Sequence, residues 1–447
     1  MPEFQAYATY IVFGLVIMAI TFNWLDMTLA AMLGLCVLTV AGVIVQKDIL
    51  KTVAASQGPL ALLFGGMVVA RVLVPTGIFD HLGTRFLILT RGSGKRFLLL
   101  LVALIAVVCA ILPNATAVIL VAPVIIRVCR ELDVDFLGPM VLTAIVSNAA
   151  GLLTLVGDPA TFFVGQAMGI SFVGYLEKVS LGGVLAIVTV VGLMPLLFSR
   201  AWNARCALAA GLRPTTIRRP YFCIFALTTL AVMVGLFLVG DSLPNPILPP
   251  SAAIIGASLA LLTIHSAKVE PIENVIRDID WKTILFIFCM MCYVEQLTKT
   301  GILGGMARTM FATFGDNLLL GALILLVTIG LTSAFLANIP VVAAAVLLTK
   351  GYLVLLHLVP EEALGPSFTD WPAPCLPLFV AMMFGGTLGG NATLIGAAAN
   401  LVSAGICAAH GRMVTFKTFL RYGAPVTACQ LAVSALYIWL LSLWTSP

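Results

Sequence analysis

Long apolar runs recur along the whole chain, each about 15 to 22 residues in length. A helix needs about 20 apolar residues to cross ~30 Å of hydrocarbon. The runs are continuous and lack the polar–apolar alternation of a membrane barrel, so they indicate helices. Hydrophobic residues make up 61% of the chain and charged residues only 10%, with a mean hydropathy of +1.13. The sequence therefore predicts an all-α polytopic membrane protein embedded in a lipid bilayer.

The apolar runs place the expected elements. Two long apolar pairs, at 97–130 and 317–357, are expected to turn back as hairpins, and interrupted helices are expected at 138–169 and 376–409. Single helices are expected at 7–22, 27–46, 58–79, 179–199, 222–240, 250–265, 281–298 and 420–444. A basic, sparsely apolar stretch divides the chain. We expect a first repeat at 1–199, a linker at 200–221 and a second repeat at 222–447.

Short motifs recur between the two halves. Pro75-Thr76-Gly77-Ile78 matches Lys299-Thr300-Gly301-Ile302, and Leu112-Pro113-Asn114 matches Leu336-Ala337-Asn338, both at an offset of 224 residues. Gly151 to Gly157 matches Gly390 to Gly396 at an offset of 239, and the difference fits an insertion around 361–374. If each hairpin re-enters without crossing, each half crosses the membrane five times, and the odd number inverts the second copy. The pattern predicts two inverted repeats of five transmembrane helices plus one re-entrant hairpin each.

The basic residues predict the orientation. With both termini extracytoplasmic, the cytoplasmic segments are 80–96, 127–135, 200–220, 266–282 and 410–421. These segments hold 17 of the 24 Lys and Arg, against six on the other side and Arg71 within a helix. Cytoplasmic loops of membrane proteins carry such an excess. The same distribution, in separate short loops, argues against nucleic-acid binding.

Both hairpins carry an amide where the chain should reverse inside the membrane: Asn114, followed by Thr116, in the first, and Asn338 in the second. Proline next to these positions interrupts helical hydrogen bonding, which leaves main-chain groups for a solute or for the amide itself. A simpler interpretation is that the two asparagines only cap half-helices. The interpretations overlap, because discontinuous helices at mid-membrane build transporter sites.

The interrupted helices supply the other expected binding groups. These are Asn148, Thr154 and Gly157 in the first half and Asn391, Thr393, Gly396 and Asn400 in the second. Half-helix N-termini offer N–H groups with partial positive charge, which suit an oxygen-rich neutral or anionic solute. The alternative for the glycines is close helix packing through small residues.

Three ionisable residues fall within or near the expected spans: Arg71, Asp158 and Glu295. Such groups are costly in lipid and are usually functional or paired. Asp158 is the first candidate for a proton- or sodium-coupling group, with a helix cap as the alternative. Glu295 is a second candidate. Arg71 is more often a structural partner or an interfacial residue.

Other functional classes find little support. Cys289 and Cys292 lie within an apolar run without a second pair or a nearby His, so no metal site is expected. No catalytic constellation, nucleotide-binding loop or cofactor motif is present, so the chain is not expected to be an enzyme. An ion gradient should drive transport unless an ATPase subunit does so. The sequence leaves open whether the protein forms a homodimer, because exposed apolar surfaces are normal in lipid and do not mark a dimer interface.

At these residues the chain resembles the arsenite/antimonite permease and melanosomal P-protein branch of the ion transporter superfamily, which has a citrate transporter-like domain. The match is strongest at Thr154-Leu155-Val156-Gly157-Asp158-Pro159 and from Leu388 to Asn400. The resemblance implies substrate held between two hairpin tips and two broken helices. It also implies a location in the prokaryotic inner (plasma) membrane. The chain is most similar to a prokaryotic arsenite efflux permease.

The sequence departs from the pattern of these relatives at two places. Pro113 and Ala337 stand where relatives often carry Asp, and Gly157-Asp158-Pro159-Ala160-Thr161 replaces the usual Gly-Asp-Pro-Pro-Asn. A sparsely charged site suits an uncharged trihydroxy acid, which needs hydrogen-bond donors and acceptors rather than counter-ions. The leading hypothesis is arsenite and antimonite efflux in exchange for protons. The alternatives are a small carboxylate or inorganic anion transporter and a sodium/proton antiporter.

Overall fold

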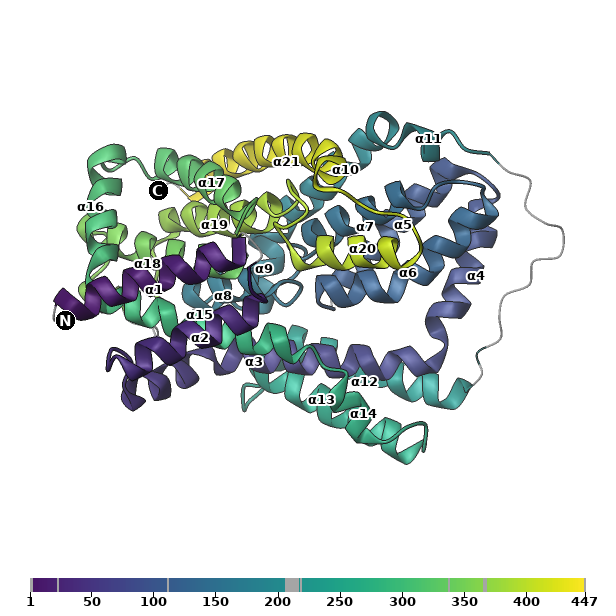
Figure 1. Ribbon diagram of the computed structural model, residues 1–447, viewed down its shortest axis with the longest axis horizontal. Helices are drawn as coiled ribbons and strands as arrows, with labels where there is room; N and C mark the ends of the chain where they lie inside the picture. The colour runs from purple at the N-terminus through teal and green to yellow at the C-terminus, as the bar shows by residue number, and fades with distance from the viewer. Residues whose placement is uncertain are drawn as a thin grey trace.

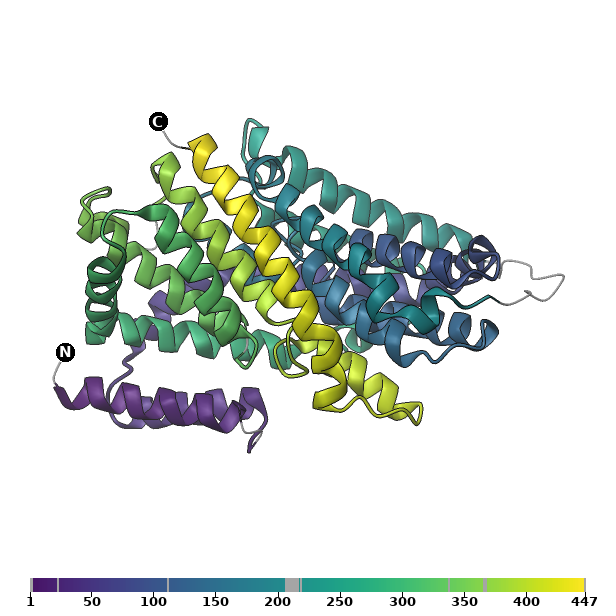
Figure 2. The ribbon, with the colours of Figure 1, turned by 90° about the horizontal axis from the view of Figure 1, so that it is seen from above.

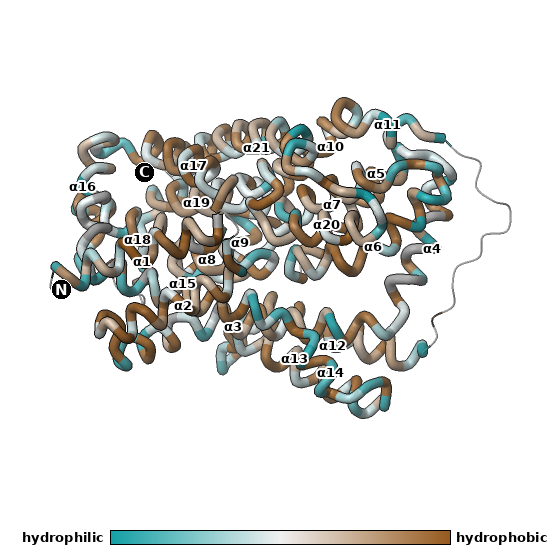
Figure 3. Tube along the Cα trace, in the orientation of Figure 1, coloured by the Kyte–Doolittle hydropathy of each residue, from teal (hydrophilic) through white to brown (hydrophobic). Residues whose placement is uncertain are grey.

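The computed structural model describes residues 3–21, 24–110, 112–205, 217, 219–336, 338–364 and 368–445. Every named element in this part of the chain is a helix, and six helices are long and apolar enough to cross a membrane. Many of their apolar side chains are exposed, and the trace is hydrophobic over much of its length (Figure 3). The all-α polytopic prediction is confirmed. Most of the predicted linker, residues 206–216 and 218, lies outside the described residues.

The first half of the chain runs from α1 to α11 (Figure 1). Its elements are α1 (Glu3–Thr21), α2 (Met27–Val40), α3 (Gln46–Leu73), the 3₁₀ turn η1 (Val74–Thr76), α4 (Ile78–Thr90), α5 (Gly94–Cys109), α6 (Asn114–Glu131), α7 (Leu137–Ala150), α8 (Pro159–Met168), α9 (Phe172–Lys178), α10 (Ser180–Leu197) and α11 (Ser199–Trp202).

The second half of the chain runs from α12 to α21. Its elements are α12 (Pro220–Val239), η2 (Gly240–Ser242), α13 (Pro249–Ser266), α14 (Ile272–Arg277), α15 (Trp281–Thr300), α16 (Ile302–Phe314), α17 (Leu318–Ser333), α18 (Asn338–Leu355), η3 (Glu361–Leu364), η4 (Ala373–Cys375), α19 (Leu376–Gly389), α20 (Ala398–Ala409) and α21 (Phe416–Thr445).

Element boundaries in the two halves follow the sequence offsets. Helices α4, α5 and α6 begin and end 224 residues before α16, α17 and α18, and α7 begins and ends 239 residues before α19. The turns that precede α4 and α16 are also alike. Gly77 and Gly301 both adopt left-handed backbone, with φ of 73° and 77°, which glycine reaches without steric cost. The motif matches therefore coincide with repeated local structure.

Helices α4 and α16 run across opposite ends of the molecule, nearly perpendicular to the long helices (Figure 1). Both chain termini lie towards the end that α16 covers. Neither α4 nor α16 was expected as a helix. Both are short, and all but the first two residues of α4 fall in the basic stretch 80–96 that the apolar pattern assigned to a loop.

Helix α3 is also longer than expected, because it begins at Gln46 rather than near 58. The first turns of α3 are polar, so they fall outside the apolar run from which the helix was predicted. Asp48, in the first turn, accepts a hydrogen bond from the Val45 amide at 3.3 Å and pairs with Lys299 of α15. At the opposite end of α3, Arg71 pairs with Glu270 and Asp278, at 2.8 and 2.9 Å. Ion pairs thus fasten one end of α3 to α15 and the other end to the residues that flank α14.

Two central helices have no exposed face. Residues 139–150 of α7 and 377–389 of α19 are all buried. Around them, helices of one half pack against helices of the other: α6 against α20, α18 against α8, and α10 against α21. Figure 2 shows α21, in yellow, crossing the molecule obliquely. The elements that carry the expected site residues therefore meet at the centre.

Candidate functional site

The site is built from four interruptions in helical structure. One hairpin turns between α5 and α6, and the other between α17 and α18; α7 unwinds before α8, and α19 unwinds before α20. Four helices of ten or more residues, α6, α8, α18 and α20, begin at these interruptions. The first amide groups of such helices have no intrahelical acceptor and carry partial positive charge. The interruptions thus place several hydrogen-bond donors in the interior.

A threonine in each unwound segment holds the turn of its own hairpin. The Thr154 hydroxyl donates to the Ala110 carbonyl at 2.5 Å. The equivalent Thr393 hydroxyl donates to the Ala334 carbonyl. Both contacts satisfy carbonyl groups that the end of a helix leaves free. They fasten each hairpin to the unwound segment that follows it in the chain.

Two glycines let the chain fold tightly in these segments. A Cβ atom on Gly157 would lie 2.8 Å from the Gly151 carbonyl oxygen, and one on Gly396 would lie 2.6 Å from the Gly390 carbonyl oxygen. Both distances are below any real Cβ contact. Close backbone approach at Gly157 and Gly396 therefore shapes the site, and contact of these two residues with a solute stays a prediction.

Asp158 and Asn114 meet on the first-half side of the site. One Asp158 oxygen accepts from the amides of Ala160 and Thr161, at 3.1 and 3.3 Å, and so caps α8. The other lies 3.4 Å from Nδ2 of Asn114, which is also 3.5 Å from Oδ1 of Asn148. Asp158 is 6% exposed, and no described salt bridge includes it. A single carboxylate thus faces the tip of the first hairpin.

Asn338 occupies the corresponding place in the second half. With its amide turned so that the nitrogen faces the neighbouring carbonyl oxygens, Asn338 donates to Gly386 at 3.2 Å and to Gly396 at 3.0 Å. Ser333, on the preceding helix, donates to the Gly386 carbonyl at 2.6 Å. Ala337, which stands where relatives often have Asp, lies outside the described residues.

Buried amides connect the two halves. Asn148 donates to the side-chain oxygens of Asn391 and Asn400, at 2.9 and 3.2 Å. Asn400 donates to the carbonyls of Gly390 and Thr393, both at 2.8 Å. These three asparagine side chains are at most 1% exposed. Their groups are largely used in protein contacts, so they hold the unwound segments in place.

Sequence reasoning missed one member of this network. Gln430, in the middle of α21, accepts from Asn391 at 3.0 Å and donates to the Ala186 carbonyl of α10 at 3.1 Å. A single amide in an apolar span is the pattern that could have revealed it, because an unpaired amide in lipid is costly.

Three buried polar atoms near Asp158 have no hydrogen-bond partner: Asn114 Oδ1, Thr161 Oγ1 and Thr387 Oγ1. Asn114 and Thr161 both contact Asp158 through other atoms. The Thr387 hydroxyl lies beside the Asp158 carboxylate but does not meet the geometry of a hydrogen bond. Unpaired buried polar groups are rare, and each one has a cost. Thr161 and Thr387 were not among the predicted site residues.

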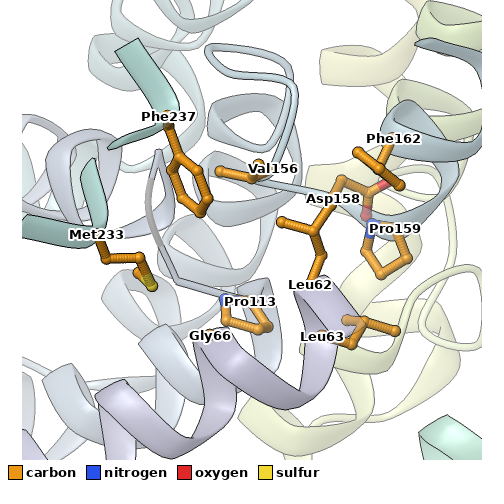
Figure 4. A pocket seen from close by; sticks show the side chains of 10 residues that line it. All are labelled: Leu62, Leu63, Gly66, Pro113, Val156, Asp158, Pro159, Phe162, Met233 and Phe237. Carbon is orange, nitrogen blue, oxygen red and sulfur yellow. The ribbon is translucent and has the colours of Figure 1, made fainter. Parts of the chain in front are cut away.

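A small cavity of about 20 Å³ adjoins Asp158 (Figure 4). It lies between the site and the apolar faces of α3 and α12, and is large enough for about one water molecule. Its lining consists of Leu62, Leu63, Gly66, Pro113, Val156, Asp158, Pro159, Phe162, Met233 and Phe237. Asp158 supplies the only charged side chain among these residues.

Two predicted residues are not joined to this cluster. Thr116 is half buried on the first turn of α6, and no described hydrogen bond links it to the other predicted residues. Glu295 lies on α15, where its carboxylate is 3.8 Å from Nζ of Lys51 on α3. No described contact joins Glu295 to Asp158. Its equivalent in the first half, Arg71, is a structural ion-pair partner.

Comparison with known proteins identifies similar chains. Residues 17–365 match the family described as "Citrate transporter" (CitMHS). An uncharacterized transporter of Synechocystis is 44% identical over 432 residues, which cover 96% of each chain. The human P protein is 27% identical over an alignment of 503 residues that covers 94% of this chain and 58% of the P protein.

A solved structure has a similar fold. The crystal structure of the Alcanivorax borkumensis YdaH transporter covers 89% of this chain, and this chain covers 87% of it, with a TM-score of 0.59. The sequence identity is 13%, so the likeness concerns the fold alone.

Proposed function

The chain belongs to the CitMHS citrate transporter family of membrane transporters, and on that premise we propose that it is a secondary active transporter for a small, uncharged oxyacid. Arsenous acid and its antimony counterpart fit this description best, and their movement is efflux in exchange for protons. The observation that supports the proposal is a site rich in amides and hydroxyls that contains one carboxylate.

The chemistry of the site favours a neutral solute over a free multivalent anion. A trihydroxy acid can both donate to and accept from amides and hydroxyls, and it needs no counter-ion. The unpaired oxygens of Asn114, Thr161 and Thr387 can accept its hydroxyl hydrogens. A multivalent anion next to the Asp158 carboxylate would be repelled unless a cation accompanied it.

Asp158 is the proposed coupling group. It is buried and lies beside the Asn114 amide and the unpaired hydroxyls. A carboxylate beside a solute site can take up and release a proton, and ionisable groups at such depths often serve as proton relays. In this scheme protonation and solute binding alternate at neighbouring atoms.

We place the protein in the prokaryotic inner membrane with both termini extracytoplasmic and the 200–221 linker cytoplasmic. Basic residues of α4, α5 and α6 support this orientation, since these helices cluster at the end opposite both termini (Figure 1). The equivalent arms α4 and α16 lie at opposite ends of the molecule, as expected if the repeats at 1–199 and 222–447 are inverted.

A second candidate substrate is a small carboxylate. The family description "Citrate transporter" favours it, and so do the four helix N-termini, which suit an anionic group. In that case a cation bound at Asp158 would offset the charge of the substrate.

The test is solute uptake by sealed proteoliposomes that contain the purified full-length protein. Arsenite, citrate and sodium are offered separately, with and without an imposed pH gradient. We expect arsenite accumulation that depends on the gradient and falls at least tenfold in Asn114→Ala and Thr393→Ala. Matched controls are Asn245→Ala in an exposed loop and Thr328→Ala on the exposed face of α17, both at wild-type rates.

Each other result selects a different function. Uptake of citrate without arsenite would replace the proposed substrate with a carboxylate. Sodium-dependent proton movement that needs neither solute would indicate a sodium/proton antiporter. Normal arsenite flux in both site variants would overturn the site assignment.

A further inference from the structure

A second, larger cavity of about 690 Å³ lies away from Asp158, at the far end of α8. It is half open and falls in the size range of pockets for small molecules and cofactors. It lies between the α8–α9 turn, the segment that precedes α19 and the last two turns of α21. Its lining consists of Met168, Gly169, Ile170, Ser171, Gly174, Lys178, Thr369, Trp371, Pro372, Ala373, Leu376, Phe379, Leu441, Trp444 and Thr445.

The lining is mostly apolar and contains one charge. Leu376, Phe379 and Leu441 contribute apolar walls, and Ser171 and Thr369 contribute hydroxyls. Lys178 is the only charged side chain among the described residues that line the cavity. A cation without an acid in the same lining matches a ligand with an apolar body and an anionic head.

The depth of Lys178 along the helices is informative. The Tyr437 hydroxyl of α21 donates to the Lys178 carbonyl at 2.7 Å. Trp444 lies seven residues further towards the end of the same helix, a rise of roughly 10 Å, and is 83% exposed. Tryptophan is enriched at the membrane–water interface. The backbone of Lys178 therefore lies deeper in the bilayer than Trp444. A lysine at such a depth extends its side chain towards the phosphate layer.

The part of the lining around Trp371 is held by several contacts. The Trp371 indole donates to the Ala167 carbonyl at the end of α8, at 3.0 Å. Its ring packs against Phe368 and Phe379, with centroids 4.9 and 5.1 Å apart, and Nζ of buried Lys350 lies 5.5 Å from its centroid. Trp371 belongs to the insertion that has no counterpart in the first half, so the two repeats do not duplicate this cavity.

We propose that this cavity binds one anionic phospholipid, with its phosphate at Lys178 and the start of an acyl chain along Leu376 and Leu441. The lipid would fill the space between the α8–α9 turn and α21. The proposal stands whether the transported solute is an oxyacid or a carboxylate, because the cavity is separate from the Asp158 site.

The test measures lipid binding to the full-length protein in detergent by native mass spectrometry. Dioleoyl phosphatidylglycerol and dioleoyl phosphatidylcholine are titrated separately. We expect one saturable phosphatidylglycerol site, with phosphatidylcholine weaker by fivefold or more. Lys178→Gln should weaken phosphatidylglycerol about fivefold, the effect of one lysine near a charged headgroup. Lys47→Gln, at an exposed lysine on α3, is the matched control and should bind like wild type.

A second variant tests whether binding needs the volume of the cavity, whereas Lys178→Gln tests whether it needs the positive charge. Ala373→Trp places a large side chain into the cavity from an exposed position, so it should block the lipid without disturbing the core. Equal affinity for the two lipids, or unchanged phosphatidylglycerol binding in both Lys178→Gln and Ala373→Trp, would overturn the proposal. Solute uptake by the same variants separates this result from a failure of the proposed transport function.

Discussion

The Nδ2 amide of Asn114 lies 3.4 Å from Oδ1 of Asp158, so the tip of the first hairpin rests on the residue that caps α8. The second half lacks this pair. At the offset of 239 residues, Ala397 stands in the position of Asp158. The two otherwise similar halves thus differ in charge where the site is most buried, and the site has one titrating group rather than two.

Replacing Asp158 with Asn should separate coupling from folding. Asparagine is about as good a helix N-cap as aspartate, so the melting temperature should stay within about 3 °C of wild type. The side chain can no longer take up and release a proton, so solute accumulation should not respond to an imposed pH gradient. Accumulation that still follows the gradient in proteoliposomes would show that another group carries the proton.

Replacing Gly396 with Ala should displace the second hairpin. The added methyl group would meet the carbonyl oxygens of Gly390 and Ala334, at 2.6 and 3.1 Å. Backbone atoms in a packed interior cannot move away at low cost, and overpacking typically destabilises by about 1 to 3 kcal/mol. We expect a lower melting temperature and at least tenfold slower uptake. Gly192→Ala on α10 is the control, because its added methyl group meets open space and should leave both measurements unchanged.

Asn148→Ala should loosen the contact between the halves. It removes the donor to Asn391 and Asn400 and leaves two buried oxygens without a partner. Such a loss costs about 1 to 3 kcal/mol, which equilibrium unfolding in mixed micelles can measure. Asn245→Ala, in an exposed loop, should cost less than about 0.5 kcal/mol. Equal effects of the two variants would mean that the buried network contributes little to stability.

The ion pair of Asp48 and Lys299 should give the protein an acid-sensitive stability. Burial opposes the charged form of Asp48, but hydrogen bonds from Lys299, the Val45 amide and Gln296 outweigh it and hold the pKa below its usual value. A carboxylate with a lowered pKa stabilises the folded state above its unfolded-state pKa, and this contribution is lost as the pH falls through the folded-state pKa.

Lys299→Met should therefore raise the pKa of Asp48 and move the onset of acid unfolding to higher pH. Unfolding midpoints measured between pH 3 and 7 test this expectation. Lys47→Met, at an exposed position one turn away from Lys51, should leave the profile unchanged. An identical profile in Lys299→Met would show that the ion pair does not contribute.

The predictions worked where one strong physical rule applied. Apolar length placed the spans, and proline and glycine placed the interruptions, so the structure brings Asn148, Asn391 and Asn400 together as the repeat suggested. The rule failed for α4 and α16, whose apolar residues follow a helical face instead of a continuous run. It also failed for Gln430. This residue belongs to the buried network because it accepts a hydrogen bond from Asn391, which is distant in sequence.

The contact between Asn148 and Asn391 spans 243 residues of chain. At a synthesis rate of 5 to 20 residues per second, the acceptor follows the donor by about 12 to 50 seconds. During that interval the newly inserted first half holds a polar amide in the bilayer with its final partner not yet made. Until Asn391 has been synthesised, the Asn148 amide needs temporary hydrogen-bond partners from water, lipid headgroups or the insertion machinery. We therefore expect membrane insertion of this protein to depend on where translation pauses.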